Sequence, residues 1–293
     1  MASRASLCSL LLFSLLLLGI TASASSQATV TIAASDSQSP LWDPACYSTY
    51  PQLETSLQDT AAQYPQIATL LDAGLSWEGT RHLWALKLGS ARLPGPKPTL
   101  LLLGGQHPRD IATSQILLRY ISYLTQTYGT DPDTTWLLDN RTILILPEAN
   151  PDGYYQVYAQ GLNQYKNRDN TACTGSVNRG VDLNRNYPYH WNTVGTSSLP
   201  CDLSYPGPSA LSEPESAGIL SLLTANNTNL LLNLQAPGPR ILYPYGYTPT
   251  PPADAPALFA LGWAIARLNG TPFANVQTHN ALAPISGIID DTA

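Results

Sequence analysis

The sequence predicts an α/β fold with a largely buried, mixed sheet. Two apolar runs carry this prediction, "PTLLLLGG" at residues 98–105 and "TILILP" at residues 142–147. Runs that are apolar throughout are typical of strands covered on both faces. Segments with helical spacing alternate with these strands, and this alternation is characteristic of the α/β class.

The first element expected is a helix from residue 50, because Leu53 and Leu57 begin a helical spacing of apolar residues. The alternating segment "HLWALKLG" then predicts a strand, followed by the buried strand at 98–105. Residues 111–128 predict a helix with Leu117, Ile121 and Leu124 on one face.

The strand at 142–147 is expected to break into a turn at "PEANPDGYY". Residues 160–210 hold few periodic runs, and ordered loops of this length are usually functional. The segment "LSEPESAGILSLLTAN" predicts a helix that opens with a capping box of Ser212 and Glu215. A buried strand at 230–235 follows, and then a helix with Asp254 as its N-cap.

Composition indicates one large soluble domain. The chain has 293 residues, of which 44% are hydrophobic and 12% charged, with a net charge of −6. A chain of this length buries a sizeable core. Because no basic run is present, we expect no nucleic-acid partner and no anionic membrane partner.

The N-terminal segment has the layout of a secretory signal peptide. Arg4 precedes an apolar stretch from Leu10 to Ile20, and small residues around Ala24 follow. We therefore expect a signal peptide at 1–24, a short linker at 25–45 and a single domain at 46–293. A secreted protein passes through an oxidising compartment, where disulfides form.

Three cysteines remain after this segment, and three cannot all pair within one chain. Cys173 and Cys201 bracket the loop-rich region and are the expected pair, which leaves Cys46 over. Secretion also agrees with three glycosylation sequons, which are weak signals; they start at Asn140, Asn226 and Asn269.

Polar residues follow the buried strands, where ligands of open α/β sheets gather. His107 and Asp110 follow the strand at 98–105, and both side chains are ordinary zinc ligands. The alternative is a surface histidine near a helix start, with Asp110 as the cap of that helix.

The long loop region contains Arg168, Asn184 and Arg185. Guanidinium and amide groups near a strand end can bind a carboxylate through paired hydrogen bonds. The alternative is a solvated loop face without a ligand.

From about residue 47 onward, the chain resembles the secreted zinc carboxypeptidases of the carboxypeptidase A/B group. The landmarks "LLLGGQHPRD", "ILPEANPDGY", "RGVDLNRNYPYHW", "YPGPSALSEPES" and "ILYPYGY" match that family in order and spacing. The resemblance implies an α/β/α sandwich on a mixed eight-stranded sheet. It also implies metal-dependent hydrolysis of the C-terminal peptide bond, by a monomer that acts on peptide or protein C-termini.

In that family two histidines and a glutamate hold one zinc ion, and a second glutamate is the general base. The resemblance assigns the roles in this chain as follows. His107 is the first zinc ligand, Asp110 stands where the family has glutamate, Arg109 contacts substrate, Arg168 polarises the scissile carbonyl, Asn184 and Arg185 clamp the substrate carboxylate, and Cys173 and Cys201 form the loop disulfide.

The chain departs from the family at the second zinc histidine, because Gln235 stands at that position. Its neutral amide is a poor substitute for imidazole, and Asp110 is one methylene shorter than glutamate. We therefore expect zinc affinity to fall by orders of magnitude. The general-base glutamate, the last sheet strand and the final helix would lie beyond Ala293, so the member is expected to be degenerate and C-terminally truncated.

A further match places Asp290 at the base of the specificity pocket, where the resemblance implies a preference for C-terminal Lys or Arg. The alternative is an ordinary solvated acidic pair of Asp290 and Asp291.

Three hypotheses follow. The first is a degenerate carboxypeptidase without competent zinc, which binds peptide C-termini or does nothing with them. The second is an active carboxypeptidase whose sequence continues beyond Ala293. The third is an unstable product, because an exposed sheet edge invites aggregation.

Overall fold

The computed structural model describes residues 47–268 and 273–293. The compact unit of the fold runs from Thr49 to Ala293. The expected signal peptide, the linker, Cys46 and the sequon at Asn269 lie outside the described residues.

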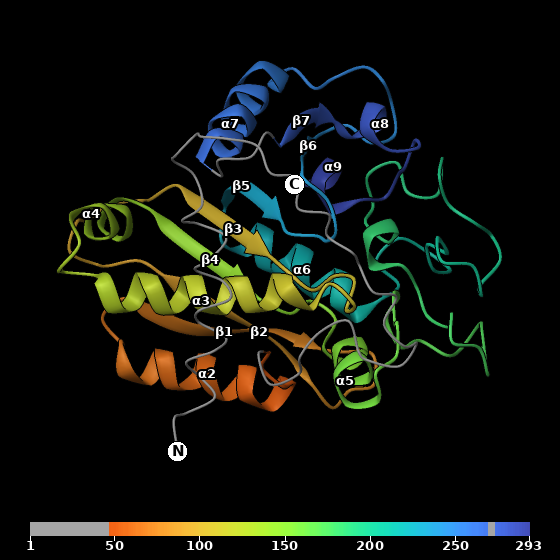
Figure 1. The fold of residues 1–293 in the computed structure, drawn as a ribbon, viewed down its shortest axis with the longest axis horizontal. Helices are drawn as coiled ribbons and strands as arrows, with labels where there is room; N and C mark the ends of the chain where they lie inside the picture. The colour runs from red at the N-terminus through yellow and green to blue at the C-terminus, as the bar shows by residue number, and fades with distance from the viewer. Residues whose placement is uncertain (1–46, 269–272) are drawn as a thin grey trace, which may run out of the picture. The chain divides into compact units, whose positions relative to one another are not determined.

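The predicted mixed α/β fold is confirmed. A main sheet of five strands has the order β1-β2-β4-β3-β5, and β6 and β7 form a separate parallel pair (Figure 1). Strand β2 is antiparallel to β1 and β4, whereas β3 is parallel to both β4 and β5. The strands are β1 (Ala68–Leu75), β2 (His82–Leu88), β3 (Thr99–Leu103), β4 (Thr142–Leu146), β5 (Thr228–Asn233), β6 (Arg240–Tyr243) and β7 (Ala274–Gln277).

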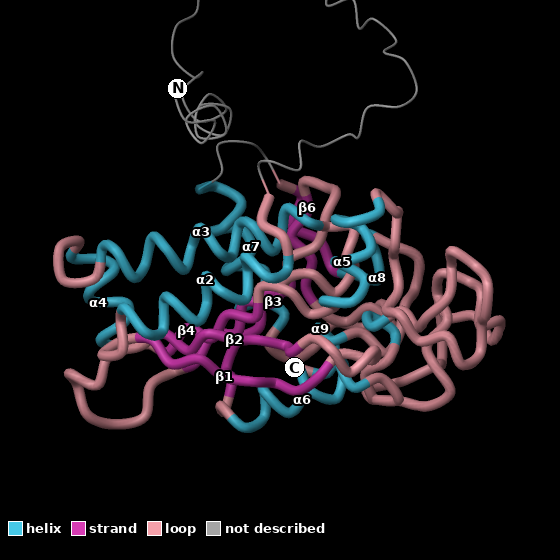
Figure 2. The backbone as a smooth tube through the Cα atoms, turned by 90° about the horizontal axis from the view of Figure 1, so that it is seen from below, coloured by secondary structure: helices cyan, strands magenta, loops and turns pink. Residues whose placement is uncertain are grey.

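Helices and long loops surround the sheets (Figure 2). Among the residues that the structure describes, no helix is long and apolar enough to cross a bilayer. The helices are α2 (Tyr50–Gln63), α3 (Ile111–Thr127), α4 (Pro132–Asn140), α5 (Pro151–Gln160), the 3-10 turn η2 (Leu183–Arg185), α6 (Pro214–Ala225), α7 (Ala255–Leu268), α8 (Thr278–Ala281) and α9 (Ile289–Thr292).

Alternation along the strands divides the core into two layers. On one face, Ile143 and Ile145 of β4 pack with apolar residues of α2, α3 and α4. On the other face, Leu144 and Leu146 pack with α6 and with Ile289 of α9. Because both faces of β3 and β4 are covered, these strands are apolar throughout, as the sequence indicated.

The predicted helices from residue 50 and over 111–128 are confirmed, and the chain bends over residues 147–150 as predicted, but the helix that follows was not predicted. There the chain enters α5. The side chain of Asn150 accepts a hydrogen bond from the Gly153 N–H, and Pro151 fills the first turn. Asparagine at the N-cap followed by proline is a helix start, and the same residue types also favour turns.

The capping box predicted for α6 is wrong. Glu213 occupies the N-cap position and makes no side-chain cap bond. Ser212 donates to the Glu213 carboxylate at 2.7 Å instead. The carboxylate of Glu215 accepts a hydrogen bond from the Trp77 backbone N–H at 2.8 Å, so a tertiary contact has replaced the local one.

Strand β5 was predicted to be buried, but most of its residues are only half-buried. Within residues 47–268 and 273–293, β5 pairs with β3 on one edge and with no strand on the other. Helix α7 also has exposed apolar side chains: Leu261 is 37% exposed and Leu268 is 88% exposed.

Replacing Leu117 with alanine should destabilise the fold by about 2–5 kcal/mol, the usual cost of emptying a core leucine site. Leu117 is 2% exposed within the cluster between α3 and the sheet, whereas its neighbour Ile116 is 54% exposed. Ile116→Ala is therefore the matched control and should cost less than about 1 kcal/mol. Urea unfolding of both variants measures the difference, and equal losses would contradict the assigned packing.

Candidate functional site

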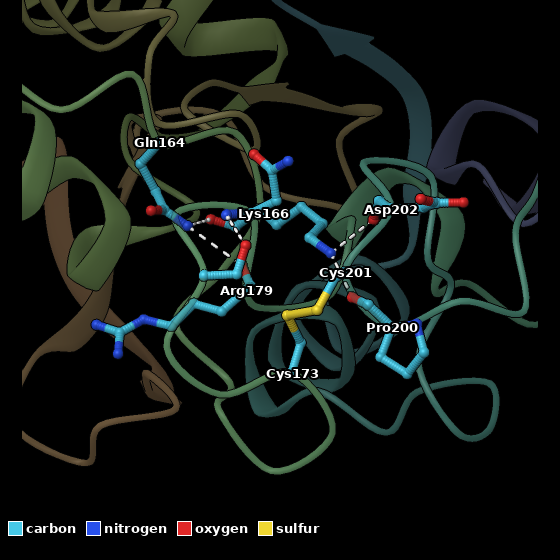
Figure 3. Close-up of a disulfide and its surroundings, with 9 residues drawn as sticks. Gln164, Lys166, Cys173, Arg179, Pro200, Cys201 and Asp202 are labelled. Carbon is cyan, nitrogen blue, oxygen red and sulfur yellow. Dashed lines mark hydrogen bonds between the residues drawn. A yellow bond between two sulfur atoms is a disulfide. The ribbon is translucent and has the colours of Figure 1, made fainter.

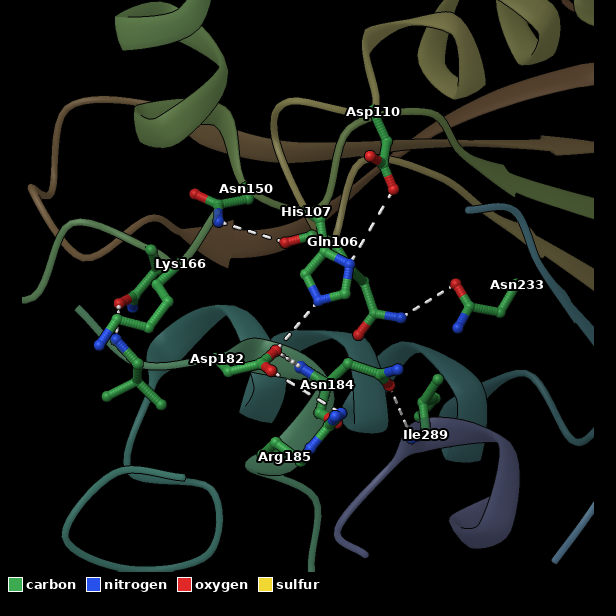
Figure 4. Close-up of polar contacts among 12 residues, drawn as sticks. Gln106, His107, Asp110, Asn150, Lys166, Asp182, Asn184, Arg185, Asn233 and Ile289 are labelled. Atoms are coloured by element: carbon green, nitrogen blue, oxygen red, sulfur yellow. Dashed lines mark hydrogen bonds and ion pairs between the residues drawn. The ribbon is translucent and has the colours of Figure 1, made fainter. Parts of the chain in front are cut away.

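The parallel register of β3, β4 and β5 gathers polar residues at one edge of the main sheet. Leu103 at the end of β3 lies opposite Leu146 of β4 and opposite Asn233 of β5. The residues that follow these three strand ends therefore meet in one region (Figure 4). They include His107, Glu148 and Gln235.

His107 is buried and held from several sides. Its Nε2 lies 3.1 Å from Oδ1 of Asp182, and its Nδ1 lies 3.9 Å from Oδ2 of Asp110. The ring of Tyr165 stacks on the imidazole, with centroids 4.0 Å apart. A histidine with one ring nitrogen on a carboxylate and the other turned toward a second acid is arranged as metal-ligating histidines commonly are.

Asp110 occupies the N-cap position of α3 but makes no side-chain cap bond. Its carboxylate accepts a hydrogen bond from the backbone N–H of Ala236 at 3.0 Å. Burial raises the pKa of Asp110, and that bond and the neighbouring His107 act in the opposite direction. The alternative that Asp110 caps the helix with its side chain is therefore wrong.

This hydrogen bond joins Asp110 to Ala236, the residue next to Gln235, whereas Gln235 itself is exposed. Among residues 47–268 and 273–293, no group of three or more His, Cys, Asp or Glu side chains is close enough to hold a metal ion. His107 and Asp110 are two suitable donors, and an exposed neutral amide is a poor third. The residues present do not fit a three-ligand zinc site.

The predicted clamp residues Asn184 and Arg185 lie on η2, directly after Asp182. The guanidinium of Arg185 lies 3.7 Å from Oδ2 of Asp182 and donates to the Asn184 carbonyl at 2.7 Å. Burial alone would raise the pKa of Asp182, but Arg185 and His107 outweigh it and hold this pKa below its ordinary value. An ionised Asp182 therefore fixes both the histidine and the arginine.

Arg109 is exposed, and its guanidinium lies over the ring of Tyr165, 4.4 Å from the centroid. The three side chains of Arg109, Tyr165 and His107 are therefore stacked in series. Burial, with the nearby Asp182, raises the pKa of Tyr165, and the charges of Arg185 and Arg109 act against this shift. The charges of both guanidinium groups thus lower the pKa of the same tyrosine and oppose the effect of burial.

Arg168 lies apart from this group. Its Nε is 3.4 Å from the carboxylate of Glu78, and its side chain is 9% exposed. It lines a hollow between α5 and the loop at 175–179. The structure thus places the residue predicted to polarise a substrate carbonyl in an ion pair at the side of the loop region.

Asp290 accepts a hydrogen bond from the side-chain amide of Asn233 at 3.2 Å. Asn233 in turn accepts one from Gln106 at 3.0 Å, and the hydroxyl of Tyr187 donates to Gln106. Burial raises the pKa of Asp290, and the bond from Asn233 opposes the shift. Asp290 therefore belongs to a polar network between β3 and β5, whereas Asp291 accepts from the Gly246 N–H.

The predicted disulfide between Cys173 and Cys201 is confirmed (Figure 3). Beside it, the ammonium of Lys166 donates to the carbonyls of Pro200 and Asp202 at 2.8 and 2.6 Å. Burial lowers the pKa of Lys166 to about 8. The disulfide and this lysine together hold the loops that carry Tyr165 and Asp182.

Sequence reasoning gave no role to Glu148, which is buried at the end of β4. Its carboxyl group accepts from the Ser114 hydroxyl at 2.8 Å and from the Asn150 N–H at 2.9 Å. A side chain at Gly105 would come within 2.4 Å of it, so the φ of +70° and the close approach both require glycine there. Tyr165 and Asp182 were also given no role, because their contacts with His107 are tertiary, although Asp182 lies within the landmark "RGVDLNRNYPYHW".

Comparison with known proteins identifies one protein family. The family model described as zinc carboxypeptidase matches residues 53–291. The chain is 30% identical over 253 residues to carboxypeptidase B of Astacus astacus, covering 84% of this chain and 81% of that protein. It is 32% identical over 232 residues to carboxypeptidase A2 of Rattus norvegicus, which covers 78% of this chain.

Among solved structures, carboxypeptidase A from Helicoverpa armigera superposes with a TM-score of 0.78 at 29% identity over 85% of this chain. The matched region is 62% of the Helicoverpa chain and 54% of the rat protein. The chain therefore spans little more than half of the rat relative and most of the Astacus one.

Glu148 gives the site a testable pH dependence. Burial raises its pKa to about 8 from an ordinary value of 4.5. Between these values the folded state holds a proton that the unfolded state has released, so the free energy of unfolding falls as the pH rises toward about 8. Glu148→Gln should remove this contribution. The variant should therefore become more stable relative to the unsubstituted chain as the pH rises. Urea unfolding from pH 5 to 8 measures it, and parallel curves would contradict it.

Proposed function

Because the chain belongs to the zinc carboxypeptidase family, we propose that it is a member with impaired or lost catalysis that still recognises peptide C-termini. One observation carries the first part of the proposal: the side chain at the third ligand position is the exposed, neutral amide of Gln235. The Ala236 N–H also engages the carboxylate of Asp110, which would otherwise face an ion.

The chemistry of the donor set supports weak metal binding. Zinc prefers imidazole, thiolate and carboxylate, and this site offers one imidazole and one short carboxylate. A metalloprotease obtains its nucleophile at neutral pH by lowering the pKa of a metal-bound water. A chain that holds the metal poorly therefore lacks the reagent for peptide hydrolysis.

The basic residues support the second part of the proposal. Arg109 and Arg185 both act on Tyr165, and Asn184 is buried beside Arg185. Guanidinium groups bind carboxylates through paired, charge-assisted hydrogen bonds. A free peptide C-terminus is a carboxylate that these groups can bind without a metal ion.

Secretion is part of the proposal. It rests on the signal-peptide layout of residues 1–24 and on the Cys173–Cys201 disulfide, since disulfides persist in oxidising compartments.

An active metallocarboxypeptidase is the second candidate. The observation that favours it is the bond between Asp182 and Nε2 of His107, which leaves Nδ1 turned toward Asp110. A carboxylate behind a ligating histidine raises the basicity of the imidazole. Zinc content separates the two candidates.

We expect purified full-length chain, dialysed against a trace of zinc, to hold no stoichiometric metal. The double variant Asp110→Glu/Gln235→His should bind about one zinc per chain, because it supplies the donors that zinc prefers. Adding His107→Ala to that variant is the control and should abolish binding. Metal analysis and zinc titration provide the readout, and one zinc per unsubstituted chain would overturn the loss of the metal site.

A pentapeptide with a free C-terminal carboxylate should bind the chain more tightly than its C-terminal amide. Arg185→Gln should weaken binding of the free peptide about tenfold or more, as expected for a lost charge-assisted bond. Arg92→Gln is the matched control, because Arg92 pairs with Asp139 and its side chain is 70% exposed. Titration calorimetry measures the affinities, and equal binding of the two peptides would exclude recognition of the C-terminus.

A further inference from the structure

A polar hollow lies between α5 and the loop at 175–179. Its volume of about 520 Å³ is within the range of small-ligand pockets. The guanidinium groups of Arg168 and Arg179 line it, and none of its described lining residues is Asp or Glu. The remaining polar residues of the lining are amides and one serine, namely Gln156, Gln160, Asn163, Gln164, Ser176 and Asn178. The lining therefore carries positive charge and many hydrogen-bond donors.

Hydrogen bonds within the loop region bring the two arginines together. The N–H of Asn167 donates to the carbonyl of Val181 at 3.0 Å, and the Val181 N–H donates to the Asn167 side chain at 2.8 Å. Arg168 follows Asn167 directly, and Arg179 lies two positions before Val181. The buried amide of Gln164 donates to the Asn167 carbonyl at 3.1 Å and to the Arg179 carbonyl at 3.5 Å (Figure 3). The backbone that carries both arginines is therefore held in place without a ligand.

Arg179 has no partner for its charge within the described residues. Among residues 47–268 and 273–293, its guanidinium forms no ion pair, and its buried Nε makes no hydrogen bond. Arg168 differs, because its Nε lies 3.4 Å from the carboxylate of Glu78. Glu78 also lies 3.2 Å from Arg81, so two guanidinium groups share this one carboxylate. The hollow therefore has a positive charge that the lining does not neutralise.

The number of donors indicates the kind of anion. A guanidinium is a planar fork that binds carboxylate or phosphate oxygens in pairs. Two such forks with several amides offer more donors than the two oxygens of a carboxylate accept. A phosphate or sulfate ester has three outer oxygens, and a phosphate ester carries nearly two negative charges. The chain has a net charge of −6, so its overall field does not attract anions, and binding would depend on these local groups.

We propose that the hollow binds a tetrahedral oxyanion, the sulfate or phosphate group of a free ion or of an ester. Arg168 and Arg179 donate to its oxygens, and the side-chain amides of the lining complete the shell. Neither Arg109 nor Arg185 lines the hollow, so this site is separate from the one proposed for peptide C-termini and does not rest on it.

Titration calorimetry of the full-length chain at constant ionic strength tests the ligand. The probes are inorganic sulfate, inorganic phosphate, glucose 6-sulfate and acetate. We expect saturable binding of the tetrahedral anions at one site per chain. Tighter binding of the ester would identify an ester as the ligand, tighter binding of the free ion would identify the ion, and both results support the proposal. Acetate that binds as tightly as sulfate, or no saturable binding of any tetrahedral anion, would overturn it.

Matched arginine substitutions test the location. Arg179→Gln should weaken sulfate about tenfold or more, as expected for a lost charge-assisted bond. The variant should fold, because Arg179 forms no ion pair with the described residues. Arg119→Gln makes the same change at an exposed position of α3 outside the hollow and should leave the affinity unchanged. Equal effects of the two variants would show a response to net charge alone and refute the site.

A second pair of variants adds charge without removing a donor. Val177 lines the hollow and its side chain is 78% exposed, so Val177→Asp places a carboxylate at the rim without disturbing the core. Repulsion between like charges should then weaken sulfate binding severalfold. Ile116→Asp is the matched control on α3, at a side chain that is 54% exposed and outside the lining. Sulfate that binds both variants equally well would contradict the assigned site.

Discussion

The parallel pairing of β3 with β4 and β5 is the constraint on which the site depends. It aligns Leu103, Leu146 and Asn233, so that the chain leaves all three strands at one edge of the sheet. The residues that follow are brought together although they lie far apart in the sequence, as the bond between Ala236 and Asp110, 126 positions apart, shows. Because helices cover both faces of the sheet, these strands are apolar, and the polar side chains of the site follow the strand ends.

At that edge, the contacts that orient His107 are present, whereas two of the ligand types expected from the family resemblance are not. Asp182 orients His107 through a short contact, and Arg185 keeps Asp182 ionised. Asp110 and Gln235, by contrast, depart from the expected ligand types. The backbone N–H of Ala236 donates a hydrogen bond to the carboxylate of Asp110.

Much of this arrangement could be predicted from the sequence, because the apolar runs of β3 and β4 and the helical spacing of α2 and α3 are strong local signals. The disulfide followed from the position of two cysteines around one loop region. The start of α5 was misjudged because Asn150 and Pro151 suit turns and helix starts equally. The capping box failed because Glu215 bonds to Trp77, far away in sequence. Tyr165, Asp182 and Glu148 could not be predicted, since their roles depend on tertiary contacts alone.

The stack of Arg109, Tyr165 and His107 places a buried imidazole and an exposed guanidinium against one tyrosine ring. A tyrosine on the flat side of the imidazole leaves the in-plane nitrogen lone pair available to a ligand. The same tyrosine also lies against the guanidinium of Arg109. The buried imidazole and the exposed guanidinium at the two ends of this stack can therefore be altered by separate substitutions.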